Sequence, residues 1–256
     1  MVQILVTRPQ PHNQRCVTAL EAKGFSVSAA PMLEIKPSDE LTSLIPRLEH
    51  ATPSTLIIAV SQYAVESCQH HLQQQGRIWP SHCQYLAVGK ATAECWQQYG
   101  VNALVPNRQD SEGMLQLIES QLNGIQHAHI LRGQHGREWL AEQLQRQQIT
   151  VNYLTCYQRH LLNYSWQQLE QWRSQINTIV ATSGEILKHL TTLMSKSQQL
   201  TWLKQTTLLV PSERLLEYAK SLGFMHIVLC DGASDKACID ALARIQSSAR
   251  NENDQK

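Results

Sequence analysis

Short apolar runs alternate with segments of helical periodicity along the whole chain, and this alternation limits the possible folds more than any other feature. Each run is aliphatic or β-branched, and a polar turn and a segment with helical spacing follow it. Such alternation is typical of parallel βα units. The expected strands lie at 4–6, 26–30, 55–60, 85–88, 129–131, 178–181, 207–210 and 226–229. We therefore predict an α/β fold built on parallel sheets.

The length and charge of the chain narrow its organisation and its ligands. A chain of 256 residues is long for one compact α/β domain and comfortable for two. The net charge of +1 gives no global field, so an anionic ligand must be met by local cations and backbone donors. Nucleic-acid binding usually requires a strongly basic face, and we expect no nucleic-acid partner.

The chain also resembles itself in three pairs of segments. Strand, turn, helix and strand occur in the same order at 4–27 and at 130–151. A buried strand that ends in a serine occurs at 55–65 and at 177–187, and a third pair lies at 85–100 and 207–223. For any single pair the alternative is that all βα units look alike. The three pairs together indicate two similar domains, although they do not follow the same order along the chain.

The order of the pairs predicts one domain inserted in another. Residues 1–36 and 160–256 would form a discontinuous α/β domain, and 38–157 an inserted α/β domain. The two crossings, at about 30–36 and 151–160, are extended in character and can pair as a two-stranded β-ladder hinge. We expect the polar segment 246–256 to be a flexible tail.

Cysteine usage and apolar patterning indicate the compartment. The chain has seven cysteines, an odd number, and none forms a Cys-x-x-Cys pair, so we interpret them as reduced packing residues. The apolar run at the N-terminus is too short for a signal peptide, and no segment approaches the ~20 apolar residues of a membrane span. These patterns predict a cytoplasmic protein without a membrane partner. We expect a monomer, because no long apolar stripe or heptad pattern remains for an oligomer.

Polar residues at the strand-to-helix turns are candidates for anion binding. Ser61, Thr92, Ser183 and Ser212 lie at such turns, where free backbone N–H groups and the helix dipole favour an anion. The alternative for each is helix N-capping, which serine and threonine commonly provide. Both roles are compatible, since a capped turn still presents its backbone amides.

Basic residues follow the same turns and could hold carboxylates by paired hydrogen bonds. They are Arg8, Lys90, Arg132, Arg137 and Arg214. The alternative is that several are solvated or pair with nearby acids, as Arg214 could with Glu213 or Glu217. Gly133 and Gly136 would allow close backbone approach in the turn that contains His135, itself a solvated loop position or a substrate contact.

Metal and nucleotide chemistry have little support in the sequence. The eleven histidines form no cluster with carboxylates at ligand spacing, so we expect no metal site. Neither a G-x-G-x-x-G pattern nor a Walker loop is present.

Several motifs in a fixed order resemble the uroporphyrinogen-III synthase family. They are ILVTRP (4–9), AVSQYAV (59–65), VGKATA (88–93), SEGML (111–115), ILRGQHGREWL (130–140), CYQR (156–159) and VPSERLLEYAKSLGF (210–224). The resemblance covers the chain from about residue 4 to residue 242. One motif departs from the pattern, because VATSGEIL (180–187) lacks the aromatic residue or asparagine that many relatives carry nearby.

The resemblance implies a cofactor-free cyclising carbon–oxygen lyase of tetrapyrrole and heme biosynthesis. Its substrate would be hydroxymethylbilane, a linear chain of four pyrroles that each carry an acetate and a propionate. Loss of the terminal hydroxyl gives an azafulvene, and a spiro intermediate then leads to uroporphyrinogen III with ring D inverted. Without an enzyme the chain closes to the symmetric isomer. Hydroxymethylbilane synthase would be a transient contact, and the sequence leaves open whether it hands over its unstable product directly.

The resemblance also implies roles for individual residues. Tyr157 would be the general acid for loss of the hydroxyl, and the alternative is an aromatic packing residue of the ladder. Thr92 would lie near the leaving group or a carboxylate arm. The expected substrate-binding residues are Arg8, Ser61, Gly89, Lys90, Arg132, Gly133, Arg137, Ser183, Ser212 and Arg214.

Two other functions fit part of the pattern. A non-catalytic two-lobed binding module would share the hinge and the helix N-termini, but would not change the isomer ratio of the product. A nucleotide-sugar transferase would require a diphosphate loop, which the sequence lacks.

Overall fold

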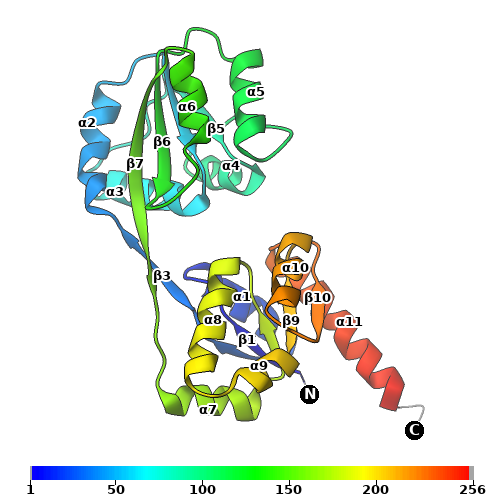
Figure 1. Cartoon of the computed structure of the whole chain (residues 1–256). Helices are drawn as coiled ribbons and strands as arrows, with labels where there is room; N and C mark the ends of the chain where they lie inside the picture. The colour runs from blue at the N-terminus through cyan, green and yellow to red at the C-terminus, as the bar shows by residue number, and fades with distance from the viewer. Residues whose placement is uncertain (1, 254–256) are drawn as a thin grey trace. The chain divides into compact units, whose positions relative to one another are not determined.

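The computed structural model describes the backbone of residues 2–253 and the side chains of residues 2–246. The chain divides into two compact units (Figure 1). Unit 1 is Met1–Glu34 with His160–Lys256, and unit 2 is Ile35–Arg159. Unit 1 contains the whole of one five-stranded sheet. Unit 2 contains most of the other, whose strands β3 and β7 cross the boundary between the units.

Unit 1 contains a parallel sheet in the order β10-β9-β8-β1-β2. Its elements are β1 (Gln3–Val6), α1 (His12–Glu21), β2 (Ser26–Ala29), α7 (Trp166–Gln175), β8 (Thr178–Val180), α8 (Gly184–Lys196), α9 (Leu200–Gln205), β9 (Thr207–Val210), α10 (Glu213–Ser221), β10 (Ile227–Leu229) and α11 (Asp235–Asn253). Helices α1 and α11 pack together and share a hydrophobic cluster with β1. Gly24, with a φ of +80°, ends the turn after α1, as its place in the sequence predicts.

Unit 2 contains the sheet β3-β7-β6-β4-β5, in which β4–β5, β4–β6 and β6–β7 are parallel. Its elements are β3 (Leu33–Pro37), a 3₁₀ helix η1 (Asp39–Ser43), α2 (Leu44–Glu49), β4 (Thr55–Ala59), α3 (Gln62–Gln74), β5 (Gln84–Ala87), α4 (Lys90–Gln97), α5 (Ser111–Gln121), β6 (His127–Gly133), α6 (Trp139–Arg146) and β7 (Thr150–Leu161). Strands β3 and β7 are neighbours, and each contains a boundary between the units.

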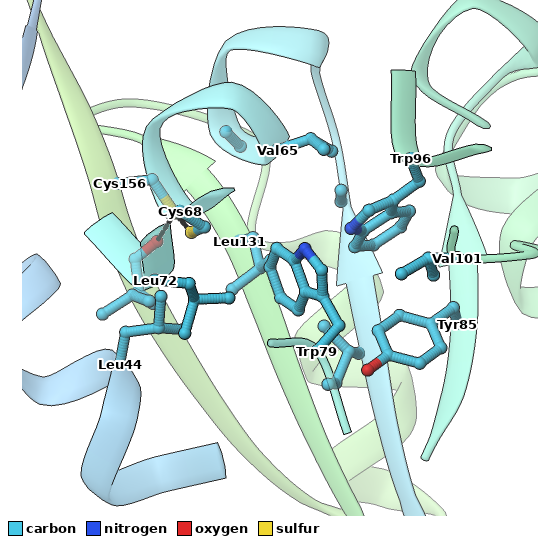
Figure 2. Close-up of a cluster of buried hydrophobic side chains, with 14 of the residues drawn as sticks. Leu44, Val65, Cys68, Leu72, Trp79, Tyr85, Trp96, Val101, Leu131 and Cys156 are labelled. Atoms are coloured by element: carbon cyan, nitrogen blue, oxygen red, sulfur yellow. Dashed lines mark hydrogen bonds between the residues drawn. The ribbon is translucent and has the colours of Figure 1, made fainter. Parts of the chain in front are cut away.

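The core of unit 2 covers both faces of its sheet. Alternate residues of β4 belong to different clusters: Ile57 packs with α2, α3 and α4, whereas Ile58 packs with α5 and α6. Figure 2 shows the first cluster, where Trp79, Tyr85 and Trp96 make edge-to-face contacts with centroids 5.3 to 6.1 Å apart. The predicted class, two similar parallel-sheet βα domains, is confirmed.

The repeated segments of the sequence occupy equivalent places in the two sheets. β1–α1–β2 corresponds to β6–α6–β7, β8–α8 to β4–α3, and β9–α10 to β5–α4. Leu104 bridges to β5 in the position that β10 takes beside β9. The first pair comes first in unit 1 but last in unit 2, so the two units are related by a permutation of chain order.

The strand register supports the same equivalence residue by residue. Val6 pairs with Val180 in unit 1, and Ile130 pairs with Ile58 in unit 2. The helices that follow these strands also begin at equivalent residues in the two units. The three pairs of helices are α8 and α3, α10 and α4, and α11 and α5. The equivalent pairs of N-terminal residues are Ser183 and Ser61, Ser212 and Gly89, and Ser234 and Asp110.

Two expectations differ from the structure. Helix capping is the alternative that the sequence offers for Thr92, but Gly89 is the N-cap of α4 and Thr92 lies inside the helix with 4% of its surface exposed. A flexible tail is expected at 246–256, but α11 continues to Asn253. Residues 254–256 lie outside the described part of the chain.

None of the helices within residues 2–253 combines the length and the apolarity needed to cross a bilayer. The same described residues contain no group of three or more His, Cys, Asp or Glu side chains suited to a metal ion. All seven cysteines are free and buried. In unit 2 the thiol of Cys68 lies 3.3 Å from that of Cys156 (Figure 2).

Candidate active site

Tyr157 is the centre of a hydrogen-bonded group in unit 2. It lies on β7, level with Gly133 of β6, and only 2% of its surface is exposed. Its phenol oxygen accepts a hydrogen bond from Arg159 Nη2 at 3.1 Å and a second from Ser61 Oγ at 3.2 Å. A buried hydroxyl held by two donors has a fixed position, which is what a proton donor requires.

Gly133 provides the space that the Tyr157 ring occupies. A Cβ atom at position 133 would lie 2.7 Å from Cζ of Tyr157, closer than packed carbon atoms approach. The register between β6 and β7 shifts at Arg132 and Gly133, so the strand irregularity and the missing side chain occur together. The ring of Tyr63 lies on another side, with its centroid 5.8 Å from that of Tyr157.

Ser61 links this group to the start of α3. It follows the buried strand β4 and has an extended backbone, which turns its side chain back toward the helix. Its hydroxyl oxygen accepts the N–H of Ala64 at 3.2 Å while it donates to Tyr157. Ser61 is therefore both the expected N-cap and a direct contact of the candidate acid.

Arg132 presents unpaired N–H groups near the end of β6. Its guanidinium carbon lies 3.9 Å from the centroid of the Tyr153 ring, and Nη2 lies 3.7 Å from Glu138 Oε1. The side chain is 13% exposed, and among the described residues its Nε and Nη1 atoms are buried without a hydrogen-bond partner. Buried donors without acceptors cost free energy, so this group favours an anionic ligand.

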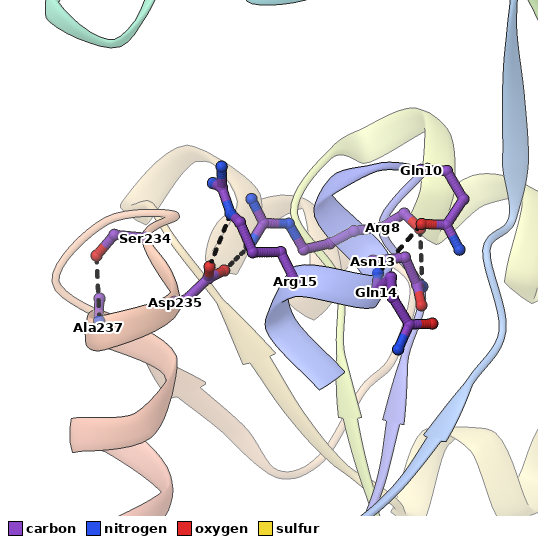
Figure 3. Close-up of polar contacts among 8 residues, drawn as sticks. All are labelled: Arg8, Gln10, Asn13, Gln14, Arg15, Ser234, Asp235 and Ala237. Carbon is purple, nitrogen blue, oxygen red and sulfur yellow. Dashed lines mark hydrogen bonds and ion pairs between the residues drawn. The ribbon is translucent and has the colours of Figure 1, made fainter. Parts of the chain in front are cut away.

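Arg8 of unit 1 has a partner within the protein (Figure 3). Its Nη1 atom lies 2.6 Å from Asp235 Oδ1, and Arg15 Nε lies 3.2 Å from the other oxygen of the same carboxylate. Asn13 fixes the turn by donating to the carbonyl oxygens of Val6 and Arg8, at 2.7 and 2.9 Å. The charge of Arg8 is thus balanced inside unit 1.

His12 lies beside the same ion pair and is neutral near pH 7. Burial, followed by the charges of Arg8 and Arg15, lowers the pKa of His12 to about 4. The region around Arg8 is therefore sensitive to acid.

The remaining predicted cations lie on the surface. Lys90, Arg137 and Arg214 are exposed, and none makes an ion pair with another described residue. Glu217, a possible partner of Arg214, instead contacts Lys220 at 2.8 Å. Lys90 and Arg214 lie in the first turns of α4 and α10, and Arg137 lies just before α6.

The remaining predicted turn residues are helix caps. Ser183 accepts the N–H of Ile186 at 3.3 Å, and Ser212 accepts that of Leu215 at 3.4 Å. At Gly89 a side chain would collide with the Gln109 amide, which accepts the backbone N–H of Lys90 at 3.2 Å in place of a side-chain cap.

The structure thus brings together part of the predicted set. Ser61, Gly133 and Tyr157 are in direct contact, and Arg132 lies next to Gly133, all within unit 2. Arg8, Ser183 and Ser212 belong to unit 1. Arg159 was not predicted, although the sequence carries its signal: residues i and i+2 of a strand point to the same side, and CYQR places Arg159 two positions after Tyr157.

Solved structures define the class of protein. A mutant uroporphyrinogen III synthase from the extremely thermophilic bacterium Thermus thermophilus aligns with 96% of this chain and 100% of its own, with a TM-score of 0.62 and 12% identity. The synthase from Helicobacter pylori 26695 aligns over 96% and 100%, with a TM-score of 0.56 and 14% identity. The chain therefore has the α/β fold of these synthases.

Sequence comparisons give the family. The model described as uroporphyrinogen-III synthase HemD matches residues 14–240. The uroporphyrinogen-III synthases of Salmonella typhimurium LT2 and Escherichia coli K12 are 37% and 36% identical over 245 residues, which are 94% of this chain and 100% of each relative. The chain belongs to the uroporphyrinogen-III synthase family. The predicted family is confirmed, and so is the predicted function at this level: a cyclising lyase of heme biosynthesis.

Proposed function

We propose that this protein converts hydroxymethylbilane into uroporphyrinogen III, with loss of water and inversion of ring D through a spiro intermediate. Two requirements follow from that chemistry. The terminal hydroxyl leaves more readily when it receives a proton, and the acidic arms of the substrate need cationic or N–H partners. Unit 2 offers a candidate for each.

The observation that carries the proposal is the hydrogen bonding of Tyr157. Its oxygen accepts from both Ser61 and Arg159, and among the described residues it donates to none. A phenol has one proton to donate, so this proton is available for a ligand. The proposed role of Tyr157 is to donate that proton to the leaving hydroxyl.

The proposed proton transfers balance over the whole reaction. Tyr157 gives its proton to the hydroxyl, the carbon–oxygen bond breaks with its electron pair on oxygen, and water leaves. The azafulvene then closes on the substituted carbon of ring D, and the spiro intermediate fragments and recloses. The ring carbon that completes the macrocycle loses its hydrogen as a proton, which restores the phenol. The net change is loss of one water.

Arg132 is the proposed contact for a carboxylate of the substrate. Its buried Nε and Nη1 atoms have no acceptor among the described residues, and a carboxylate can accept from two guanidinium N–H groups at once. Holding the flexible chain in a reactive geometry can lower the activation free energy by ~7–11 kcal/mol. The other predicted substrate contacts remain proposals of the same kind, apart from Arg8, which contacts Asp235.

The isomer ratio of the product tests the function. Hydroxymethylbilane incubated with the protein should give mainly the inverted isomer, whereas the substrate alone closes to the symmetric one. A spontaneous ratio in the presence of folded protein would contradict the proposal, and would instead favour a binding module.

The acid role has its own test. Tyr157→Phe keeps the ring against Gly133 and removes only the hydroxyl, so we expect kcat to fall roughly 10²–10⁴-fold with little change in KM. Tyr99→Phe, at a surface ring, is the matched control. A wild-type kcat for Tyr157→Phe would exclude Tyr157 as the acid.

We also propose that the protein acts as a cytoplasmic monomer and takes its substrate from hydroxymethylbilane synthase. The support is the sequence, which has no long apolar stripe for an oligomer. Sedimentation of the protein alone would measure its oligomeric state, and sedimentation with hydroxymethylbilane synthase would measure whether the two enzymes bind.

A further inference from the structure

We propose that Arg159, together with Ser61, is a positioning residue that keeps the Tyr157 phenol as a proton donor. The inference rests on the proposed acid role of Tyr157 and adds two residues whose task is to orient that group. It is carried by the hydrogen-bond directions around one oxygen atom.

Arg159 can act on the Tyr157 hydroxyl only as a donor. Its Nη2 atom lies 3.1 Å from the phenol oxygen, while its guanidinium carbon is 5.5 Å from the ring centroid. The cation is therefore at the hydroxyl end of the ring. A guanidinium has five N–H donors and no acceptor, so it cannot take up the phenol proton.

Ser61 is directed in the same way by its helix. Its oxygen accepts the N–H of Ala64 at the start of α3, and its own hydrogen points to the Tyr157 oxygen 3.2 Å away. The cap thus leaves the serine hydrogen for Tyr157. With two donors on its two lone pairs, the phenol oxygen is saturated as an acceptor, and its O–H must point to a third group.

The same two contacts favour the transition state of proton transfer. When the phenol donates its proton, the oxygen gains negative charge next to the Arg159 cation and the Ser61 hydroxyl. Hydrogen bonds to a charged oxygen are stronger than those to a neutral one. The contacts therefore stabilise the transition state more than the ground state, and they should act on kcat rather than on KM.

Substitution of Arg159 separates positioning from packing. Arg159 is exposed, so Arg159→Gln should fold, with kcat about 10- to 100-fold lower and KM within about 2-fold of wild type. Arg159→Lys keeps a cationic donor and should recover part of kcat. Arg146→Gln removes another exposed arginine of unit 2 and should keep the wild-type kcat.

A second substitution makes the test specific to the phenol. In the Tyr157→Phe background, Arg159→Gln should lower kcat no further, because there is no hydroxyl left to orient. An equal loss in both backgrounds would overturn the inference. So would a wild-type kcat for folded Arg159→Gln while Tyr157→Phe is slow, an outcome that leaves the acid role intact. A wild-type kcat for Tyr157→Phe would overturn the acid role and the inference together.

Ser61→Ala provides an independent measurement. It should lower Tm by about as much as Ser165→Ala, which removes the cap of α7, but only Ser61→Ala should also lower kcat. Equal kcat values for the two alanine variants would contradict the role of Ser61.

Discussion

Arg8 of unit 1 and Arg132 of unit 2 occupy equivalent places in two sheets of the same order, but their surroundings differ. Arg8 lies two positions after Val6, and Arg132 lies two positions after the equivalent residue, Ile130. Arg8 contacts the Asp235 carboxylate at 2.6 Å, whereas Arg132 lies 3.7 Å from the exposed Glu138 and keeps buried N–H atoms without acceptors among the described residues. The same framework therefore holds one arginine in a close ion pair and one whose Nε and Nη1 atoms have no acceptor among the described residues.

One position contributes to the difference. Asp235 follows Ser234 at the start of α11, and the equivalent position, after Asp110 at the start of α5, is Ser111. Unit 2 thus has no carboxylate at the position from which Asp235 contacts Arg8, and Arg132 instead lies 3.7 Å from Glu138. Duplicated folds can assign stability to one copy of a residue and ligand binding to the other by changing one side chain.

Within this comparison, the largest expected effect separates the two arginines. Arg132→Gln should lower kcat/KM about 10- to 100-fold, because it removes hydrogen bonds from a charged donor to a substrate carboxylate. Arg8→Gln should act mainly on stability, since it leaves Asp235 with Arg15 alone. Steady-state kinetics and urea unfolding of both variants measure the contrast. An unchanged kcat/KM for Arg132→Gln would remove the distinction.

A smaller effect concerns acid and the neighbourhood of Arg8. The pKa of His12 is about 4 in the folded unit and near 6.5 in an unfolded chain. Between these values the unfolded chain binds more protons, so the free energy of unfolding should fall as pH drops from 6.5 toward 4. After allowance for solvent screening we expect about 1–2 kcal/mol.

Unfolding in urea at pH 7 and pH 5 measures this loss. In His12→Gln the difference between the two pH values should be smaller, whereas the exposed His82→Gln should behave like the wild type. The same pH dependence in His12→Gln would assign the acid sensitivity to other groups.

The smallest expected effect comes from a substitution at Ser111, the position equivalent to Asp235. Ser111→Asp places a carboxylate where unit 1 has Asp235, so it should compete with substrate for Arg132 and raise KM several-fold, about 1 kcal/mol. Gln116→Asp, exposed on the same helix, adds the same charge and should leave KM unchanged. A normal KM for Ser111→Asp would show that the equivalence does not extend to this side chain.

The architecture could be predicted from the sequence because it depends on local patterns. The apolar runs and the three repeated pairs predicted the strands and the likeness of the two units, and the register confirms that likeness down to the helix N-termini. Family motifs added Tyr157, which pattern alone does not distinguish from a packing residue.

Contacts between distant residues could not be predicted in the same way. Arg8 and Asp235 are separated by 227 positions, and nothing local in ILVTRP indicates an internal partner. Gly133 was expected to approach the substrate, whereas its missing side chain makes room for the Tyr157 ring. Thr92 was misplaced because threonine usually caps, but here Gln109 occupies the turn at Gly89.

The discontinuity of unit 1 sets the order in which the two sheets are completed during synthesis. β1 lies between β2 and β8 in the sheet. Because β8 begins at Thr178, it is synthesised only after the whole of unit 2, which ends at Arg159. β1 must therefore wait for its second neighbour, with one edge uncovered, while Ile35–Arg159 is translated. The sheet of the discontinuous unit is therefore completed after the inserted unit has been made, contrary to the usual N-to-C order of domain folding.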